Sequence, residues 1–349
     1  MTSDCNWSCA YCYQRKEKKS IDQALLKDAC SFFSRSLTDE SLVNFCGGEP
    51  LLALDSIRLA VEILGDKTRA KSKGPRFTVT TNGSLVTSEA IRLFSRFDFE
   101  VLVSHDGLAQ DERRPGTRQP LSRLLDRLLG EPRILTATNS VFTPRTVNTL
   151  AASIRSLAER GIPKVYISLS NNSVWSRGAL AKLADELRLL RRWLRGFYEK
   201  HGRIPVVDFR KPDSRGMSLC SAGRSRLALA SDGTLWGCHF FPEYFAALPK
   251  DSSESRKYRF GGLGGFLRDP EGVLARKRRY YAPVRIDYCH TARSFCQLCR
   301  HLEQCAVCPV AAALVSSVIG RISNSTCRLS RLLIRERKLF WVGVKPAAG

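Results

Sequence analysis

Residues 5–12 read Cys-Asn-Trp-Ser-Cys-Ala-Tyr-Cys, a short loop that carries three of the thirteen cysteines of this 349-residue chain. The thiolates of Cys5, Cys9 and Cys12 can hold three irons of a [4Fe–4S] cluster and leave the fourth iron open, whereas electron-transfer clusters use four cysteines. Because an open iron can bind a substrate, this spacing indicates catalysis. The alternative at this point is a zinc site that takes its fourth ligand from elsewhere in the chain.

Downstream of this loop, helix-like and strand-like patterns alternate from residue 20 to about residue 205. The helical patterns predict helices at 20–37, 55–65, 87–97, 120–130, 145–161 and 179–202. The patterns between them predict strands at 41–50, 76–83, 99–107, 133–142 and 164–170. Repeated strand–helix units of this length indicate a parallel sheet covered by helices, with its chemistry at the strand ends.

Two of these segments carry a resemblance to a known family. The cysteine loop includes Tyr11 before its third cysteine, and Gly47-Gly48-Glu49-Pro50 follows the first predicted strand. Both are similar to motifs of the radical S-adenosylmethionine (SAM) superfamily, in which the GGEP motif binds the amino group of SAM. Paired glycines allow a backbone to approach a ligand closely, and the Glu49 carboxylate can accept hydrogen bonds from an ammonium group.

Further residues extend this resemblance along the chain. Ser104 and Asp106 lie in a Ser-His-Asp-Gly segment similar to the SxDG segment of the family, which contacts the carboxylate and ribose region of SAM. Arg114 falls where the family often has an arginine for the SAM carboxylate, which suits the bidentate fork of its guanidinium. Asn82 and Asn139 also follow predicted strand ends, and we expect them to line the same pocket.

The resemblance implies a partial (β/α)6 TIM-like barrel over residues 1–205. In the family a strand normally leads into the cysteine loop, but only four residues precede Cys5 here. We therefore expect either that the barrel lacks its first strand or that the true start lies upstream. A linker is expected at 206–217, a cysteine-rich domain at 218–330, and a basic C-terminal helix and tail at 331–349.

Eight cysteines crowd the last third of the chain, between residues 220 and 327. Alternating leucines, an Asp232-Gly233 turn and a returning cysteine predict a β-hairpin at 220–238. This region resembles the SPASM extension of radical SAM enzymes, which has a β-hairpin and helices and carries two auxiliary [4Fe–4S] clusters. Since pairs of the type CxxC also have zinc spacing, structural zinc is the alternative.

The resemblance also implies how these cysteines divide between two clusters. One auxiliary cluster is expected to use Cys296, Cys299, Cys305 and Cys327. The other is expected to use Cys220, Cys238 and Cys308. The fourth ligand of this second cluster is either Cys289, the remaining cysteine nearby, or none. In the latter case the fourth iron is open to substrate. Two residues rather than the usual three separate Cys305 from Cys308, which can rotate Cys308. Cys30 and Cys46 are expected to be core thiols.

By this resemblance the chain is an enzyme that uses SAM and three [4Fe–4S] clusters. A reductant such as flavodoxin or ferredoxin would supply the electron that cleaves SAM to methionine and a 5′-deoxyadenosyl radical. That radical would abstract hydrogen from a peptide or protein substrate, with the protein supplying orientation. The expected reaction is maturation of a ribosomally synthesised peptide by thioether, ether or carbon–carbon crosslinking, or by epimerisation.

Three alternatives stay open. The first is formation of formylglycine in an anaerobic sulfatase, a branch in which an aspartate directly after the last hairpin cysteine serves as base. The chain has His239 at that position. A histidine has a pKa near neutrality and can also accept a proton. The replacement of the aspartate by a histidine nevertheless argues against this branch. The others are a nucleic-acid-modifying radical SAM enzyme and a non-catalytic zinc-binding protein.

Composition limits the partners. Lys and Arg number 56 against 33 Asp and Glu, a net charge of +23, which suits an acidic partner such as an acidic precursor peptide. Nucleic acid is the less expected partner, because no RNA-binding motif of the K/R-G-F-G-F type is found. The sequence has neither a long apolar run nor a basic start followed by an apolar segment. It therefore predicts no membrane span, no secretory signal and a cytoplasmic location.

Overall fold

The computed structural model describes residues 1–69, 74–170, 173–211, 220–246, 248, 252–281, 296 and 299–344. The chain folds into two compact units, each assembled from three separate stretches. Unit 1 comprises Met1–Ser104, Leu121–Thr136 and Ser221–Pro283, and unit 2 comprises His105–Pro120, Ala137–Cys220 and Val284–Gly349. The boundaries expected from the motifs, at residues 205, 217 and 330, stay predictions.

A five-stranded sheet forms the framework of the described residues. Its strands follow one another in the order β1 Leu42–Phe45, β2 Arg76–Thr81, β3 Glu100–Ser104, β4 Leu135–Phe142 and β5 Lys164–Leu169. The pairs β1–β2, β2–β3 and β4–β5 run parallel. Every predicted strand contains one observed strand, which ends at or before the predicted limit. The α/β class expected of a partial barrel is therefore confirmed.

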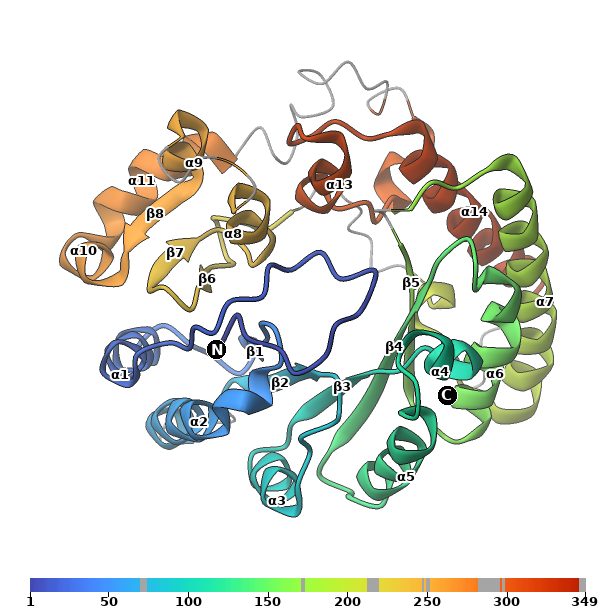
Figure 1. The fold of residues 1–349 in the computed structure, drawn as a ribbon, viewed down its shortest axis with the longest axis horizontal. Coiled ribbons are helices and arrows are strands. Elements are labelled where there is room, and N and C mark those ends of the chain that lie inside the picture. Colours follow the sequence, from blue (N-terminus) through green and yellow to red (C-terminus); the bar gives the residue numbers. More distant parts are fainter. Residues whose placement is uncertain are drawn as a thin grey trace. The chain divides into compact units, whose positions relative to one another are not determined.

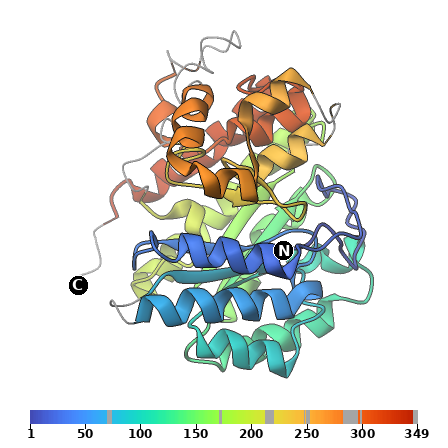
Figure 2. The ribbon, with the colours of Figure 1, turned by 90° about the vertical axis from the view of Figure 1, so that its left-hand side faces the viewer.

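Aromatic side chains in β1 and β2 and directly before β3 pack together in the core of unit 1. Phe45, Phe77 and Phe99 are buried, and their ring centroids lie 5.6 to 6.3 Å apart. Helices α1 Gln23–Phe33, α2 Leu54–Arg69 and α3 Ser88–Arg96 lie along the outside of these strands (Figures 1 and 2). The side chains of Asp22 and Thr87 begin α1 and α3 by accepting backbone hydrogen bonds from the first turn.

The remainder of unit 1 contains the predicted hairpin. Strands β6 Ala228–Leu229 and β7 Thr234–Trp236 pair antiparallel, and Gly233 takes a φ of 80° in the turn between them. A third strand, β8 Arg259–Gly262, pairs with β7 and was not predicted. Four short helices accompany these strands: α8 Phe240–Phe245, α9 Ser253–Tyr258, α10 Leu263–Arg268 and α11 Pro270–Tyr281. The hydroxyl of buried Tyr281 accepts from the Gly237 N–H at 2.7 Å, which fixes the strand end next to the hairpin's last cysteine.

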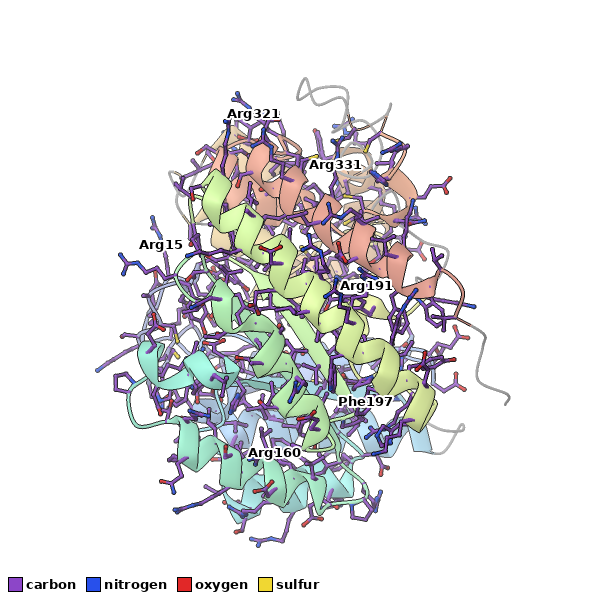
Figure 3. All side chains as sticks on the ribbon, turned by 90° about the vertical axis from the view of Figure 1, so that its right-hand side faces the viewer. Arg15, Arg160, Arg191, Phe197, Arg321 and Arg331 are labelled. Atoms are coloured by element: carbon purple, nitrogen blue, oxygen red, sulfur yellow. The ribbon has the colours of Figure 1, made fainter. Side chains whose placement is uncertain are left out.

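Helices dominate unit 2. They are α4 Gln110–Arg113, α6 Leu150–Glu159, α7 Arg177–His201, α13 Pro309–Ser316 and α14 Asn324–Trp341, while α5 Arg118–Leu129 runs along the chain from unit 2 into unit 1. Helices α7 and α14 lie side by side (Figure 3). Arg191 of α7 pairs with buried Glu336 of α14 at 2.7 Å, and Arg195 donates to the carbonyl of Leu339 at 2.7 Å. These contacts fix one face of α14. No helix in the described residues is long and apolar enough to span a membrane.

A buried carboxyl group in unit 2 makes stability depend on pH. Asp208, in the 3-10 helix η4 Val207–Phe209, accepts from the Ile167 N–H at 2.9 Å. Burial raises the pKa of Asp208 to about 6, although this hydrogen bond and Arg337 oppose the shift. The pKa of Asp208 is higher in the folded than in the unfolded chain. Protonated Asp208 therefore adds to the free energy of unfolding below about pH 4, and this contribution is lost as the pH rises through 6.

We therefore expect Asp208→Asn to raise the free energy of unfolding by up to about 3 kcal/mol at pH 8, and by about half of that at pH 5. Asparagine keeps an oxygen for the Ile167 N–H but carries no charge. Urea unfolding at both pH values measures the effect. Asp185→Asn, which removes an exposed ion pair with Arg188, is the matched control and should change stability by less than about 0.5 kcal/mol. An equal gain at both pH values would contradict the assignment.

Candidate functional site

The cysteine loop is closed at its base by the segments on either side of it. Backbone hydrogen bonds join Ile21 to Met1 and Ser3 to Lys19, both at 2.9 Å. Inside the loop, the N–H of Cys12 donates to the carbonyl of Cys9 at 3.0 Å.

The three predicted ligands act on one another electrostatically. Burial is the main cause that raises the pKa of Cys12, and the Cys9 and Cys5 thiols raise it further. The loop therefore brings the three predicted iron ligands into one region of unit 1.

The two glycines of the GGEP segment lie directly against this loop. The N–H of Gly48 donates to the carbonyl of Thr2 at 2.9 Å, and that of Glu49 donates to the carbonyl of Asp4 at 2.8 Å. A Cβ atom on Gly48 would lie 2.0 Å from the Asp4 carbonyl oxygen, and one on Gly47 would lie 2.1 Å from the Thr2 carbonyl oxygen. A side chain at either position would collide with the backbone that leads into the cysteine loop, so both positions require glycine. The sequence alone did not reveal this contact.

Glu49 joins the ends of two strands. Its side chain is fully buried, and Pro50 after it begins the 3-10 helix η1 Pro50–Ala53. One carboxylate oxygen accepts from the Thr81 hydroxyl at 2.7 Å and the other from the Asn82 N–H at 2.7 Å. Burial raises the pKa of Glu49, and these hydrogen bonds oppose the rise. Glu49 therefore holds the end of β2 against the turn that follows β1, while its contact with the SAM amino group stays a prediction.

Asn82 connects this strand end to the cysteine loop. Its amide nitrogen donates to the Asn6 side-chain oxygen at 2.9 Å and lies 4.0 Å from the Cys5 sulfur. Its own oxygen accepts from the Ser84 N–H at 2.9 Å, which fixes the orientation of the amide. The structure thus places a predicted pocket residue beside a predicted iron ligand.

The Asp-Gly part of the SxDG-like segment belongs to unit 2. Asp106 is fully buried and accepts from the Val141 N–H at 2.9 Å. Its other oxygen lies 4.0 Å from the Arg114 guanidinium, which is itself buried. Gly107 has a φ of 62°, and a Cβ atom there would lie 2.2 Å from the Ser153 Cβ. The structure therefore brings the predicted SAM-binding residues Asp106 and Arg114 together.

Asn139 and His105 lie on the same side of unit 2. The Asn139 side chain accepts from the Ser168 hydroxyl at 2.8 Å, and its backbone carbonyl accepts from the His105 N–H at 3.0 Å. His105 was not among the predicted residues. Its Nδ1 accepts from the Gly107 N–H, and its buried Nε2 has no hydrogen-bond partner among the described residues. Burial lowers the pKa of His105 to about 4, so the imidazole is neutral, and because Nδ1 accepts a hydrogen bond the proton is on the buried Nε2.

His239 lies in unit 1 at the start of α8. Its ring lies 4.2 Å from that of Phe240, centroid to centroid. Burial, and to a smaller extent Arg226, lowers its pKa to about 4. The side chain is therefore a weaker base than the near-neutral histidine expected from the sequence, because burial penalises the imidazolium form.

One turn after His239, Glu243 contacts the segment that follows the cysteine loop. Its carboxylate accepts from the Arg15 N–H at 3.3 Å, and burial raises its pKa. Glu243 was not among the predicted site residues. The spacing of four residues from His239, which places both on one helix face, was the signal that could have found it.

The C-terminal cysteines of unit 2 also gather. Burial raises the pKa of Cys327, and the neighbouring thiols raise it further, namely those of Cys296, Cys299 and Cys305. These are the four ligands expected for one auxiliary cluster. For the other cluster, Cys308 caps α13 by accepting from the Ala311 N–H at 3.4 Å, Cys238 is buried in unit 1, and Cys220 belongs to unit 2. Cys289 lies outside the described residues.

The donor chemistry of both cysteine groups suits iron–sulfur clusters. Thiolates hold the irons of [4Fe–4S] clusters and also bind zinc, so this donor set is compatible with either metal. The Asn82 amide nitrogen, 4.0 Å from the Cys5 sulfur, lies where it can hydrogen-bond a ligating thiolate, which is one way in which a protein tunes an iron–sulfur cluster. Cys30 is buried in α1, as expected of a core thiol. Cys46 is partly exposed as a residue, but burial raises the pKa of its thiol, and its carbonyl accepts from the amino terminus.

Comparison with known proteins gives the following likenesses. Residues 1–168 match the model of the radical SAM superfamily. A solved structure described as native anSMEcpe with bound AdoMet and Kp18Cys peptide is 16% identical, with a TM-score of 0.75, over 98% of this chain and 96% of that one. The radical SAM cyclopropyl synthase TigE of Paramaledivibacter caminithermalis is 21% identical over 96% of this chain and 72% of TigE.

The uncharacterized protein MJ0907 of Methanocaldococcus jannaschii is 29% identical over 31% of this chain. The match covers 37% of that relative's length. The identity to anSMEcpe is low, so that likeness shows the shared fold.

Proposed function

Since this chain is a radical SAM protein through its residues 1–168, we propose that it cleaves SAM reductively and abstracts hydrogen from a peptide substrate. The proposal depends on one observation. The segment that leads into the cysteine loop is hydrogen-bonded to Gly48, and the Asn82 amide nitrogen lies 4.0 Å from the Cys5 sulfur. A [4Fe–4S] cluster held by this loop supplies the electron that splits SAM. The protein orients the reactants and excludes water.

The residues around the loop have distinct tasks in this proposal. Glu49 fixes the turn on which the loop rests, and Asn82 lies where an amide N–H can hydrogen-bond a ligating thiolate. In unit 2, Asp106 orients the Arg114 guanidinium, whose fork suits the SAM carboxylate. The neutral His105 offers a buried N–H in the same segment.

A peptide is the substrate class that several observations favour. The anSMEcpe structure holds a peptide together with AdoMet, and TigE is named as a cyclopropyl synthase. The net charge of +23 suits an acidic precursor peptide. We propose maturation of a ribosomally synthesised peptide by crosslinking or epimerisation, with two auxiliary clusters and a flavodoxin- or ferredoxin-type reductant. Formylglycine formation is the second candidate, and His239 in place of an aspartate disfavours it.

Mass spectrometry of candidate acidic peptides, after anaerobic incubation with SAM and dithionite, tests this proposal. A crosslink lowers the peptide mass by two hydrogen atoms. Formylglycine made from Ser lowers it by the same amount, whereas formylglycine made from Cys also exchanges sulfur for oxygen, and both formylglycine products react with hydrazide. Epimerisation in heavy water adds one deuterium. Release of 5′-deoxyadenosine with no change in any acidic precursor would contradict the peptide substrate, and absence of release would contradict the SAM chemistry.

The base in this reaction is expected to be Glu243 rather than His239. At physiological pH an imidazole with a pKa of about 4 is a weak base, whereas burial moves the Glu243 pKa toward the working pH. Glu243→Gln should lower formation of modified peptide by about a hundredfold or more, while 5′-deoxyadenosine is still released. His239→Gln is the paired control and should change product formation far less. The opposite order of the two variants would return the role to His239.

A further inference from the structure

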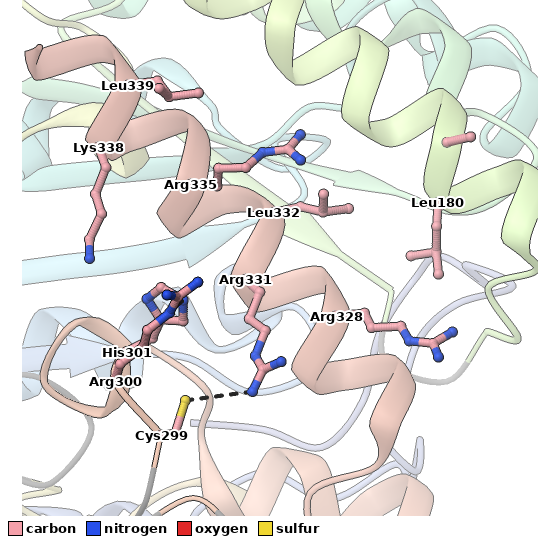
Figure 4. Close-up of a pocket in the computed structure, with 11 residues that line it drawn as sticks. Leu180, Cys299, Arg300, His301, Arg328, Arg331, Leu332, Arg335, Lys338 and Leu339 are labelled. Carbon is pink, nitrogen blue, oxygen red and sulfur yellow. Dashed lines mark hydrogen bonds between the residues drawn. The ribbon is translucent and has the colours of Figure 1, made fainter.

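Unit 2 contains a basic cavity of about 1010 Å³ between α7, residues 299–301 and α14. Five permanently charged side chains line it: Arg300, Arg328, Arg331, Arg335 and Lys338. Figure 4 shows Arg331 directed toward Cys299, with Arg328 and Lys338 extending from α14 on either side of it. None of the described residues that line the cavity is acidic.

Four of these charges form one row on α14. Arg328, Arg331, Arg335 and Lys338 follow a three-, four- and three-residue spacing, and all four are exposed. On a helix this spacing places side chains on one face, over a length of about 15 Å. Buried Glu336, on an adjoining face of α14, fixes the helix to α7. The backbone that carries the row is therefore held in place beside the cavity.

Most of this charge has no counter-charge within the described residues. Arg335 pairs with Glu336 at 2.9 Å. Arg331 lies 3.8 Å from the Cys299 sulfur, and Arg328 and Lys338 have no carboxylate within ion-pair distance in the described part of the chain. A concave surface lined by one sign of charge concentrates ligands of the opposite sign.

We propose, on the basis of the peptide-modifying function above, that this cavity binds an acidic segment of the substrate in extended conformation. Successive cations on α14 are about 4.5 to 6 Å apart along the helix axis, and every second residue of an extended chain advances about 6.6 Å. Acidic side chains at alternate positions therefore meet successive cations.

The lining of the cavity favours a peptide over nucleic acid. Leu180, Leu332 and Leu339 contribute apolar surface, which suits the residues between the acidic ones. Among the described residues that line the cavity none is Phe, Tyr or Trp, so this part of the lining offers no platform on which nucleic acid bases stack.

Fluorescence anisotropy with the holoenzyme tests the site. The probe is a labelled peptide, Gly-Glu-Ala-Glu-Leu-Glu-Ala-Glu-Gly, compared with the same peptide carrying Gln at every Glu position. We expect the Glu peptide to bind at least about tenfold more tightly, with an affinity that falls as salt rises. The double variant Arg328→Glu with Lys338→Glu should weaken binding by about tenfold or more.

A matched double variant controls for net charge. Arg192→Glu with Lys200→Glu makes the same charge change at exposed positions of α7 outside the cavity, and should weaken binding less than about threefold. An equal loss in both double variants would overturn the proposal. If the charge-reversed cavity variant does not fold, Arg328→Gln with Lys338→Gln tests the same row.

Two further outcomes separate the alternatives. Tighter binding of a single-stranded DNA of equal charge, weakened by the cavity variant, would assign the site to nucleic acid instead. Release of 5′-deoxyadenosine by the wild-type holoenzyme is measured in parallel. Peptide binding without release counts against the proposed function alone, whereas release without peptide binding counts against this site alone.

Discussion

Cys9→Ala is expected to abolish release of 5′-deoxyadenosine from SAM. The loop offers three thiols, so removal of one leaves a cluster with two protein ligands next to a position that must stay open. Changes to the outer shell of a metal site already cost about 10–100-fold in affinity or activity. Loss of a direct ligand should therefore lower release by more than about a hundredfold. Anaerobic incubation with SAM and dithionite, followed by chromatography, measures it.

Cys30→Ala is the matched control for this variant. Cys30 is also a cysteine of unit 1, but it is buried in α1 and belongs to neither cysteine group. Its removal should leave release and the iron bound per chain close to the wild-type values. If Cys9→Ala still releases 5′-deoxyadenosine at the rate of the Cys30→Ala protein, then Cys9 does not hold the catalytic cluster.

Gly48→Ala should have the second large effect, because it adds one methyl group where no space exists. That Cβ atom would lie 2.0 Å from the carbonyl oxygen of Asp4 and 3.1 Å from the Cβ of Cys5. A backbone oxygen cannot turn away as a flexible side chain can, so the loop must move. We expect the protein to lose about 1–3 kcal/mol of stability and most of its capacity to bind iron through the loop.

Iron analysis after anaerobic reconstitution and thermal unfolding measure both effects. Gly196→Ala is the matched control, since Gly196 lies within helix α7 and a Cβ atom there meets nothing within 4 Å. That substitution should leave iron binding unchanged and stabilise the helix by about 0.5–1 kcal/mol. If Gly48→Ala binds the cluster normally, then the close contact between Gly48 and the residues Asp4 and Cys5 is not needed for cluster binding.

Local patterns were sufficient for most of the fold. The alternation of apolar and polar residues predicted all five strands, because each lies between a helix and a turn with clear signals. The Asp232-Gly233 turn likewise predicted the β6–β7 pair. The strand β8 was missed because its sequence, Arg-Phe-Gly-Gly, has too little apolar alternation to resemble a strand. It pairs through its backbone, which the sequence pattern does not reveal.

The candidate site was only partly predictable, since its chemistry depends on contacts distant in sequence. The motif identified Gly48, but not that Thr2 and Asp4 press against this turn. Glu243 contacts Arg15 across 228 positions of the chain, and nothing near either residue indicates this. The lowered pKa of His239 likewise follows from burial, which depends on the whole unit rather than on its neighbours in sequence.

The passage of the chain back and forth between its two units has a consequence during protein synthesis. Unit 1 begins at Met1 but takes its last stretch from Ser221–Pro283. A ribosome must therefore release most of the polypeptide before the first unit can close, and the cysteine loop waits in an incomplete fold until then. Neither unit can be separated by a single cut.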